Sequence, residues 1–288
     1  MFEGTFTAIV TPFDRNGKVD YVRFRELIEF QIAGGVSGLV PVGTTGESPT
    51  LNYEEHQKVI EAAITHAKGR VKIIAGTGAN STDEAVALTR HAKDAGADAT
   101  LQVTPYYNKP NREGLIRHFS AVADLGLPVI LYNVPGRTGK EIPVDVVVEL
   151  SRHPHVAGIK EAAGSADRVS QIFSQCDLDV LSGDDGLTLP MMVLGAKGVI
   201  SVASNIIPAE VSRMVNAALG GRWEEARRLH YQYYRVFSDL FLDTNPVPVK
   251  AALAMMGRIE ETYRLPLCEM PEALRLKLKQ TLSAAGIL

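Results

Sequence analysis

Eight short apolar runs, each followed by a stretch of helical period, repeat along the chain and leave few folds open to it. The runs start roughly every 20–35 residues, which is the spacing of a strand–helix repeat. Most of them are continuous in Val, Ile, Leu and Ala, as is typical of parallel strands buried on both faces. The pattern predicts eight parallel strands, at residues 7–11, 38–42, 71–75, 99–104, 129–133, 156–160, 179–182 and 198–202.

The segments between the runs carry apolar residues at helical spacing, as Phe24, Leu27 and Ile28 illustrate. Ser81 followed by Glu84 predicts a capping box at the start of one of these helices. No linker rich in Pro, Gly or Ser divides the chain. The strands and helices are therefore expected to form one continuous unit.

After the eighth run the sequence predicts a helix near Pro208–Leu219 and then shows no strand signal. Apolar residues between Leu229 and Phe241 mark one further helix, which Asn245-Pro246-Val247-Pro248 ends. We predict an α/β fold: a single (β/α)8 TIM barrel over residues 1–222, with a C-terminal helical extension over 223–288 packed on it. A doubly wound open sheet is the alternative, because strand–helix alternation alone does not show closure. The count of eight favours the barrel.

Composition excludes several classes of protein. The 30 Lys and Arg and 33 Asp and Glu are interspersed and sum to −3, so no nucleic-acid partner is expected. The longest apolar stretch, residues 190–203, contains Lys197 and is shorter than the ~20 residues of a membrane helix. The first residues lack the pattern of a secretion signal, and Cys176 and Cys268 are expected to be free thiols. We therefore expect a cytoplasmic protein with no membrane partner.

The active site of a parallel barrel lies at the C-terminal ends of its strands. There the sequence carries hydroxyls, one lysine and one arginine, and its 7 histidines show no metal-ligand spacing. Asp184 and Asp185 could bind a cation, although a turn after the seventh strand is the favoured interpretation. The sequence has no Gly-x-Ser-x-Gly elbow, and Gly76-x-Gly78 lacks the third glycine of a dinucleotide fingerprint. Carbonyl chemistry with neither metal nor organic cofactor remains.

Lys160 closes the sixth apolar run, so its side chain is expected to emerge from the barrel interior. A desolvated ammonium group loses its charge more readily, and the neutral amine attacks a carbonyl to form a Schiff base. The structural alternative is an ion pair of Lys160 with Glu161 or with a phosphate group. Position alone leaves both interpretations open.

Other strand-end residues suit the same chemistry. Tyr132 and Tyr107 are phenols that can pass protons, although aromatic residues in barrels more often serve packing. The Gly-Thr-Thr-Gly stretch at 43–46 can offer N–H groups and hydroxyls to a carboxylate, or can be a simple turn. Arg137 can bind a carboxylate through two hydrogen bonds, or can be an ordinary loop arginine.

Four motifs occur in order along the chain, three of them at predicted strand ends. They are Gly43-Thr44-Thr45-Gly46-Glu47, Tyr132-Asn133-Val134-Pro135-Gly136-Arg137-Thr138-Gly139, Gly158-Ile159-Lys160-Glu161 and Asn245-Pro246-Val247-Pro248-Val249-Lys250. Together they resemble the dihydrodipicolinate synthase/N-acetylneuraminate lyase family of pyruvate-dependent barrels, and the resemblance covers nearly the whole chain. Arg137 points to the synthase branch, since sialic-acid lyases typically lack this arginine.

The resemblance implies that pyruvate condenses with L-aspartate 4-semialdehyde to give 4-hydroxy-tetrahydrodipicolinate, a step of diaminopimelate and lysine biosynthesis. Lys160 would form the Schiff base with pyruvate, so no cofactor would be needed. Tyr132, Thr44 and Tyr107 match the family's proton relay, with Tyr132 as the main donor and acceptor. The implied substrate contacts are Thr45, the backbone at Ile200 and Gly183 for pyruvate, and Arg137 for the semialdehyde carboxylate.

The resemblance also implies an assembly and a regulator. The family's residue that matches Tyr107 enters the neighbouring subunit's site, which implies a close dimer, usually paired into a homotetramer. Pro49 and Tyr53 stand where the best-known lysine-sensitive pattern has Ala and His, so we expect weak to moderate inhibition by lysine at the dimer interface. The residues that match the family's lysine site are Ser48, His56, Asn80, Glu84 and Tyr106.

Three other functions stay open at this point. Another pyruvate-dependent aldolase or lyase, acting on a sugar acid, would use the same Lys160, and Arg137 discriminates against it. A non-catalytic barrel that senses a keto acid would not need the proton relay. A phosphate-handling isomerase would carry a glycine-rich anion site after the seventh and eighth strands, where residues 201–205 offer only a poor one.

Overall fold

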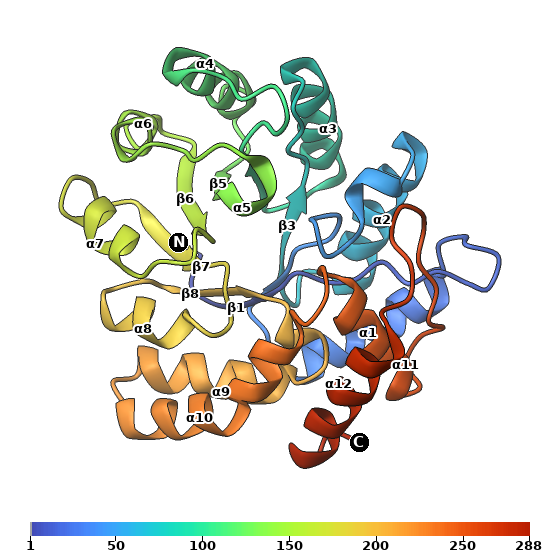
Figure 1. The fold of residues 1–288 in the computed structure, drawn as a ribbon. Helices are drawn as coiled ribbons and strands as arrows, with labels where there is room; N and C mark the ends of the chain where they lie inside the picture. Colours follow the sequence, from blue (N-terminus) through green and yellow to red (C-terminus); the bar gives the residue numbers. More distant parts are fainter. Residues whose placement is uncertain (1) are drawn as a thin grey trace.

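The computed structural model describes residues 2–288 of the chain. Its eight strands are parallel and form a closed barrel in the order β1 to β8, which β8 completes by pairing with β1 (Figure 1). The closure confirms the (β/α)8 barrel and excludes the open doubly wound sheet. The strands are β1 Gly4–Thr7, β2 Gly38–Leu39, β3 Lys72–Gly76, β4 Ala99–Val103, β5 Val129–Asn133, β6 Val156–Glu161, β7 Asp179–Ser182 and β8 Gly198–Ser201.

Helices surround this barrel, and the last three of them follow the eighth strand–helix unit (Figure 1). The helices are α1 Tyr21–Ala33, α2 Tyr53–Ala67, α3 Thr82–Ala95, α4 Arg112–Ala123, α5 Pro135–Thr138, α6 Val144–Leu150, α7 Asp167–Phe173, α8 Thr188–Val193, α9 Pro208–Leu219, α10 Trp223–Asp239, α11 Val247–Met255 and α12 Glu272–Ala284, with short 3-10 helices η1 Ser48–Thr50 and η2 Ala203–Asn205. Among residues 2–288, no helix is both long and apolar enough to cross a membrane.

The first strand is the one whose predicted position was wrong. The apolar run suggests residues 7–11, whereas β1 ends at Thr7, where it pairs with Ser201 of β8. Beyond that point the Asn205 side chain bonds the backbone: its Oδ1 accepts from the N–H of Val10 and its Nδ2 donates to the carbonyl of Ala8. The N–H groups of Ala8 and Ile9 still bond the carbonyls of Ser201 and Val40, but at Val10 a side chain takes the place of the neighbouring backbone.

Two buried apolar clusters hold the barrel together. One fills the barrel interior with inward-pointing side chains such as Phe6, Ile74, Leu101 and Ile200, which are at most 4% exposed. The larger cluster lies between the outer faces of the strands and the helices. Strands buried on both faces need apolar residues at successive positions, which explains the continuous runs in the sequence.

Asp or Asn side chains cap the starts of three helices. Asp20, Asn52 and Asn111 accept backbone N–H groups at the starts of α1, α2 and α4, and Asn52 forms a complete capping box with Glu55. The box predicted from Ser81 and Glu84 is absent, because the Ser81 side chain makes no capping bond at α3. Glu84 instead lines a surface cavity.

The C-terminal part holds more structure than the sequence predicts. The helix expected between Leu229 and Phe241 is α10, but α11 and α12 follow it. Pro246 and Pro248 flank the first residue of α11. The N–H groups of a helix's first turn have no partner within the helix, so proline, which lacks this group, loses no hydrogen bond there. The two prolines therefore mark the start of α11 as well as the end of the segment before it. Helix α12 contacts both α10 and α11, and α11 also contacts η2, which follows β8.

His118 on α4 gives the fold a measurable acid sensitivity. Its Nδ1 lies 2.9 Å from the Thr82 hydroxyl, its Nε2 is buried without a partner among the described residues, and burial lowers its pKa from 6.5 to about 4. Above pH 6.5 the ring is neutral in both the folded and the unfolded chain, so its titration does not change the free energy of unfolding. As the pH falls from 6.5 towards 4, the unfolded chain takes up the proton first, and the free energy of unfolding drops.

We expect the wild-type chain to lose about 3 kcal/mol more of its unfolding free energy between pH 6.5 and pH 4 than a His118→Asn variant does. Urea unfolding followed by circular dichroism at a series of pH values measures this difference. Parallel curves for the two proteins would contradict a buried neutral imidazole.

Candidate active site

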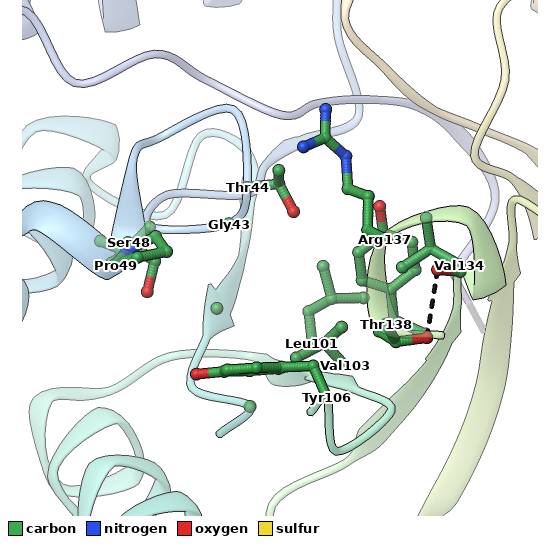
Figure 2. Close-up of a pocket in the computed structure, with 14 residues that line it drawn as sticks. Gly43, Thr44, Ser48, Pro49, Leu101, Val103, Tyr106, Val134, Arg137 and Thr138 are labelled. Carbon is green, nitrogen blue, oxygen red and sulfur yellow. Dashed lines mark hydrogen bonds between the residues drawn. The ribbon is translucent and has the colours of Figure 1, made fainter. Parts of the chain in front are cut away.

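The C-terminal strand ends converge on a cavity of about 210 Å³. It is lined by residues that follow β2, β3, β4 and β5, and the turn after β2 faces the short helix α5 across it (Figure 2). The cavity lining includes three residues predicted for the site, Thr44, Tyr132 and Arg137, and two predicted for the lysine site, Ser48 and Tyr106.

Lys160 lies near the end of β6, as predicted, and is 6% exposed. Parallel pairing of β5 with β6 places it directly beside Tyr132, and its Nζ lies 4.3 Å from the centre of the Tyr132 ring. Within residues 2–288, no carboxylate lies within 4.0 Å of this Nζ. The amine therefore lies against the Tyr132 ring, which lines the cavity.

Glu161, the alternative partner for Lys160, points the other way. Both of its oxygens accept hydrogen bonds of 3.0 Å from Asn133 Nδ2, one accepts the N–H of Ala163, and the Arg168 guanidinium lies 3.4 Å away. Burial raises the pKa of Glu161, while Asn133 and Arg168 oppose that shift. Glu161 is therefore bonded to Asn133, Ala163 and Arg168 and not to Lys160. The alternative that Lys160 forms an ion pair with Glu161 is wrong.

The Gly-Thr-Thr-Gly stretch forms a tight turn after β2. Its internal hydrogen bonds start from the N–H groups of Gly46, Glu47 and Ser48, and so do not use those of Thr44 and Thr45. Thr44 lines the cavity, and its side chain reaches towards the middle in Figure 2. Backbone N–H groups of a turn that are left over in this way form a site for an anion.

Arg137 approaches from the opposite side of the cavity, on helix α5 (Figure 2). Its Nη2 donates a 3.0 Å hydrogen bond to the backbone carbonyl of Asn245. A guanidinium carries five N–H donors, so the remaining ones are available to a carboxylate. Asn245 also donates from Nδ2 to the Thr45 hydroxyl at 3.0 Å, so one residue contacts both walls of the site.

Gly183 and Ile200 do not line the cavity. Ile200 is fully buried in the interior cluster that also contains Tyr132. A Cβ at Gly183 would lie 2.6 Å from Ala162 Cβ and 2.9 Å from Lys160 Cε. Gly183 therefore leaves the room that the lysine side chain occupies.

Tyr107 is the one predicted catalytic residue that stands apart from the others. It lies in the loop after β4 with φ at 71° and is 90% exposed, and it does not line the cavity of this chain. Its neighbour Tyr106 does line the cavity. Within a single chain, the structure therefore does not join Tyr107 to Tyr132 and Thr44.

Asp184 and Asp185 form a turn rather than a cation site. Asp184 accepts the N–H of Gly186, while Asp185 is buried and accepts from the Ser201 hydroxyl and from the N–H groups of Val202 and Ala203. Those N–H groups are the ones that a phosphate-binding barrel would present to its ligand at this position. Because a carboxylate already occupies them, the phosphate-handling alternative fails.

A second cavity of about 200 Å³ adjoins the first, and Ser48, Pro49 and Tyr106 line both. It contains four of the five residues predicted for the lysine site: Ser48, His56, Glu84 and Tyr106. The fifth, Asn80, donates from Nδ2 to the carbonyl of Tyr106 at 3.3 Å. Pro49 and Tyr53, which depart from the lysine-sensitive pattern, line the same cavity.

Charge in the second cavity is negative on balance. Burial lowers the pKa of His56 to about 4, so its ring is neutral at pH 7. Burial and, after it, the Glu84 carboxylate raise the pKa of Tyr106, so the phenol stays protonated. A cationic ligand would therefore find one carboxylate and no opposing charge among these residues.

Sequence reasoning missed three contributors to the site. Asn245 and the buried pair Glu47–Lys250 belong to recognised motifs but carried no predicted role. Asn133 bonds Glu161 beside the Tyr132–Lys160 pair, and it too was unassigned. Each of these contacts joins residues that are 28 or more positions apart, so no local pattern in the sequence predicts it. The presence of these residues in the motifs was the signal that could have indicated a role.

A closed (β/α)8 barrel with a cavity at its C-terminal strand ends, lined by apolar side chains and a few polar ones, is the architecture of a barrel enzyme. Comparison with known protein families shows which family of barrel enzymes this is. The Dihydrodipicolinate synthetase family matches residues 1–285, and the chain belongs to this family.

Known relatives resemble the chain over its full length. The 4-hydroxy-tetrahydrodipicolinate synthase of Geotalea uraniireducens is 52% identical over 291 aligned residues, which span 100% of both chains. The chloride-inhibited dihydrodipicolinate synthase of Acinetobacter baumannii, solved in complex with pyruvate, has a TM-score of 0.98 at 45% identity over 100% of both chains. The enzyme of Cyanidioschyzon merolae, solved with lysine bound, has a TM-score of 0.96 at 39% identity over 100% of this chain and 99% of that one.

The space left by Gly183 can be tested directly. We expect Gly183→Ala to slow covalent labelling of Lys160 by glyoxylate and cyanoborohydride by about a hundredfold, because the new methyl group displaces the lysine side chain. Peptide mapping by mass spectrometry measures the labelling rate, and circular dichroism checks that the variant folds.

Gly186→Ala is the matched control on the same loop, since a Cβ there meets its nearest atom at an ordinary 3.4 Å. It should label Lys160 at the wild-type rate. Equal rates for the two variants would contradict the role given to Gly183.

Proposed function

We propose that the chain is a 4-hydroxy-tetrahydrodipicolinate synthase, which condenses pyruvate with L-aspartate 4-semialdehyde in diaminopimelate and lysine biosynthesis. One observation carries the proposal: a buried lysine amine at a barrel strand end, with no carboxylate partner within residues 2–288, lies against a tyrosine that lines the cavity. The full-length relatives that carry this name support it. The unpaired Cys176 and Cys268 fit the cytoplasm, where we place the enzyme.

In the first half-reaction Lys160 Nζ attacks C2 of pyruvate, and loss of water gives a protonated Schiff base. The pyruvate carboxylate lies against the turn after β2, where the N–H groups and hydroxyls of Thr44 and Thr45 face it. Removal of a methyl proton then gives an enamine, with the iminium nitrogen as electron sink. The covalent bond to Lys160 supplies the activation, so we propose that no metal or organic cofactor takes part.

In the second half-reaction the enamine carbon attacks the aldehyde of the semialdehyde, and the resulting alkoxide takes a proton. Tyr132 is the donor, in a relay with Thr44, since both residues line the cavity beside Lys160. Arg137 binds the semialdehyde carboxylate from α5. The substrate amino group then attacks the Schiff-base carbon, which closes the ring and releases Lys160.

The exposed Tyr107 supports an assembly. A tyrosine that is 90% exposed at a loop tip next to the site can complete the relay only in the cavity of a neighbouring subunit. We therefore propose a close dimer that exchanges Tyr107, paired again into a homotetramer.

Trapping with borohydride tests the function. We expect pyruvate and borohydride together to add one reduced pyruvyl group per chain, on Lys160, and Lys160→Met to abolish both the adduct and turnover. Intact mass, peptide mapping and a coupled assay with L-aspartate 4-semialdehyde measure this. An adduct scattered over surface lysines, or none, would point to the keto-acid sensor instead. Light scattering on the same sample should give a tetramer, and a monomer would contradict the assembly.

Arg137→Ala separates the synthase from an aldolase or lyase for sugar acids. It should leave trapping at Lys160 near the wild-type rate but raise the KM for the semialdehyde by about a hundredfold, as loss of a charged, two-point contact does. Lys140→Ala, a nearby basic residue that does not line the cavity, is the control. Unchanged semialdehyde kinetics in Arg137→Ala would remove the main support for the synthase.

We also propose that lysine binds in the second cavity and inhibits weakly to moderately. Glu84 supplies the charge for the ligand's ammonium groups, and a relative solved with lysine bound supports the ligand. Pro49 and Tyr53 narrow the cavity relative to smaller residues.

Lysine titrated to millimolar concentration should lower the velocity of the wild type. Glu84→Gln should weaken this effect about tenfold, the cost of losing one charged hydrogen bond. Flat velocity across the titration of the wild-type enzyme would exclude the inhibitor site.

A further inference from the structure

An ion pair lies fully inside the protein beside the active site. Lys250 Nζ of α11 lies 2.5 Å from Glu47 Oε1, which follows the turn after β2, and both side chains are 0% exposed. The ammonium also lies over the Phe13 ring at 4.2 Å and the Tyr263 ring at 5.3 Å. No step of the proposed reaction uses either charge.

Such a pair is expensive to bury. Removing two charges from water costs several kcal/mol per ion, and their mutual attraction returns that cost only when the geometry is good. Burial accordingly lowers the pKa of Lys250, against the attraction of Glu47. Because two apolar side chains would stabilise the fold at least as well, the pair calls for a role beyond packing.

The two charged residues join the same two segments that meet at the active site. Glu47 stands two residues after Thr45, and Lys250 stands five residues after Asn245. Between these segments Asn245 Nδ2 donates to the Thr45 hydroxyl, and the carbonyl of Asn245 accepts from Arg137. One segment, 245–250, thus bonds both the turn after β2, which carries the cavity residue Thr44, and Arg137 of α5, and its far end is tied to Glu47.

The direction of the Asn245 hydrogen bond matters for an anionic substrate. Because the Thr45 oxygen accepts from Asn245, the hydroxyl's own proton is free to be donated elsewhere. Thr45 is 3% exposed, and its hydroxyl makes no second hydrogen bond within residues 2–288, so its proton has no partner in the protein there. Asn245 thereby presents Thr45 as a donor to a carboxylate.

We propose that Glu47 and Lys250 are positioning residues that hold segment 245–250 on the turn after β2, so that Asn245 fixes Thr45 and Arg137 for the two substrate carboxylates. The proposal rests on the function proposed above and adds the residues that set substrate affinity. Lys160 on β6 and Tyr132 on β5 do not contact the pair, so the chemical steps that they carry out should not depend on it. Loss of the pair should therefore weaken substrate binding more than it slows the chemical steps.

Two variants and their combination test this in the full-length enzyme. Lys250→Met and Glu47→Gln each leave one charge buried without its partner, and both should lower the melting temperature. The double variant has no lone charge, so its melting temperature should recover. Its KM for pyruvate should nevertheless stay raised about tenfold to a hundredfold, the effect of losing a hydrogen bond to a charged group, with kcat within about threefold of the wild type.

The split between KM and kcat distinguishes positioning from stability. A purely structural pair would reduce the amount of folded enzyme, which lowers kcat and leaves KM unchanged, and the double variant would then recover fully. Recovery of the wild-type KM in the double variant would overturn the proposal. If Lys250→Met does not fold, the double variant still decides between the two outcomes.

Two controls complete the experiment. Lys58→Met removes an exposed ion pair with Glu54 on α2 and should change neither KM nor melting temperature noticeably. Borohydride trapping of pyruvate on wild-type Lys160 reports the proposed function separately. If the wild type traps pyruvate and the double variant keeps the wild-type KM, the positioning role fails while the function stands.

Discussion

The pairing of β5 with β6 sets the geometry on which the rest of the site depends. In this parallel register Tyr132 stands beside Lys160 on the inner face, and Asn133 stands beside Glu161 on the outer face. The outer pair is buried and joined by two hydrogen bonds, so a shift of one residue would break it and would also turn Lys160 towards the helices. A polar contact on one face of the sheet thus holds Tyr132 and Lys160 side by side on the other.

Strand identity and the location of the site could be predicted from the sequence, because both follow from local patterns. Continuous apolar runs marked the seven strands β2 to β8, and the residues that end the runs marked the cavity wall. The position of β1 could not be predicted in this way. Its end is decided by Asn205, some 195 residues away, which bonds the backbone at Val10. Likewise, the capping box at Ser81 fits the local sequence but is not formed in the fold.

Within the site, the errors and gaps have separate physical causes. The direction of Glu161 was available from the sequence, since successive residues of a strand point to opposite faces. The contacts of Asn245 with Thr45 and Arg137 were not available, because they bring together segments 200 and 108 residues apart. Tyr107 lies outside its own cavity, and no pattern within one chain indicates where an exposed loop tip is bound.

The buried Glu47–Lys250 pair has a consequence for how the enzyme is made. A ribosome releases the chain from its N-terminus, so Glu47 emerges 203 residues before the cation that compensates it. Until Lys250 arrives, the turn that carries Thr44 and Thr45 cannot be buried without a lone carboxylate, which is strongly unfavourable. The nascent barrel can therefore assemble its strands, Lys160 among them, during synthesis, yet the turn beside the cavity is completed only when α11 docks. Chains broken off before that point would be left without a working pocket, so they would not compete for a central metabolite.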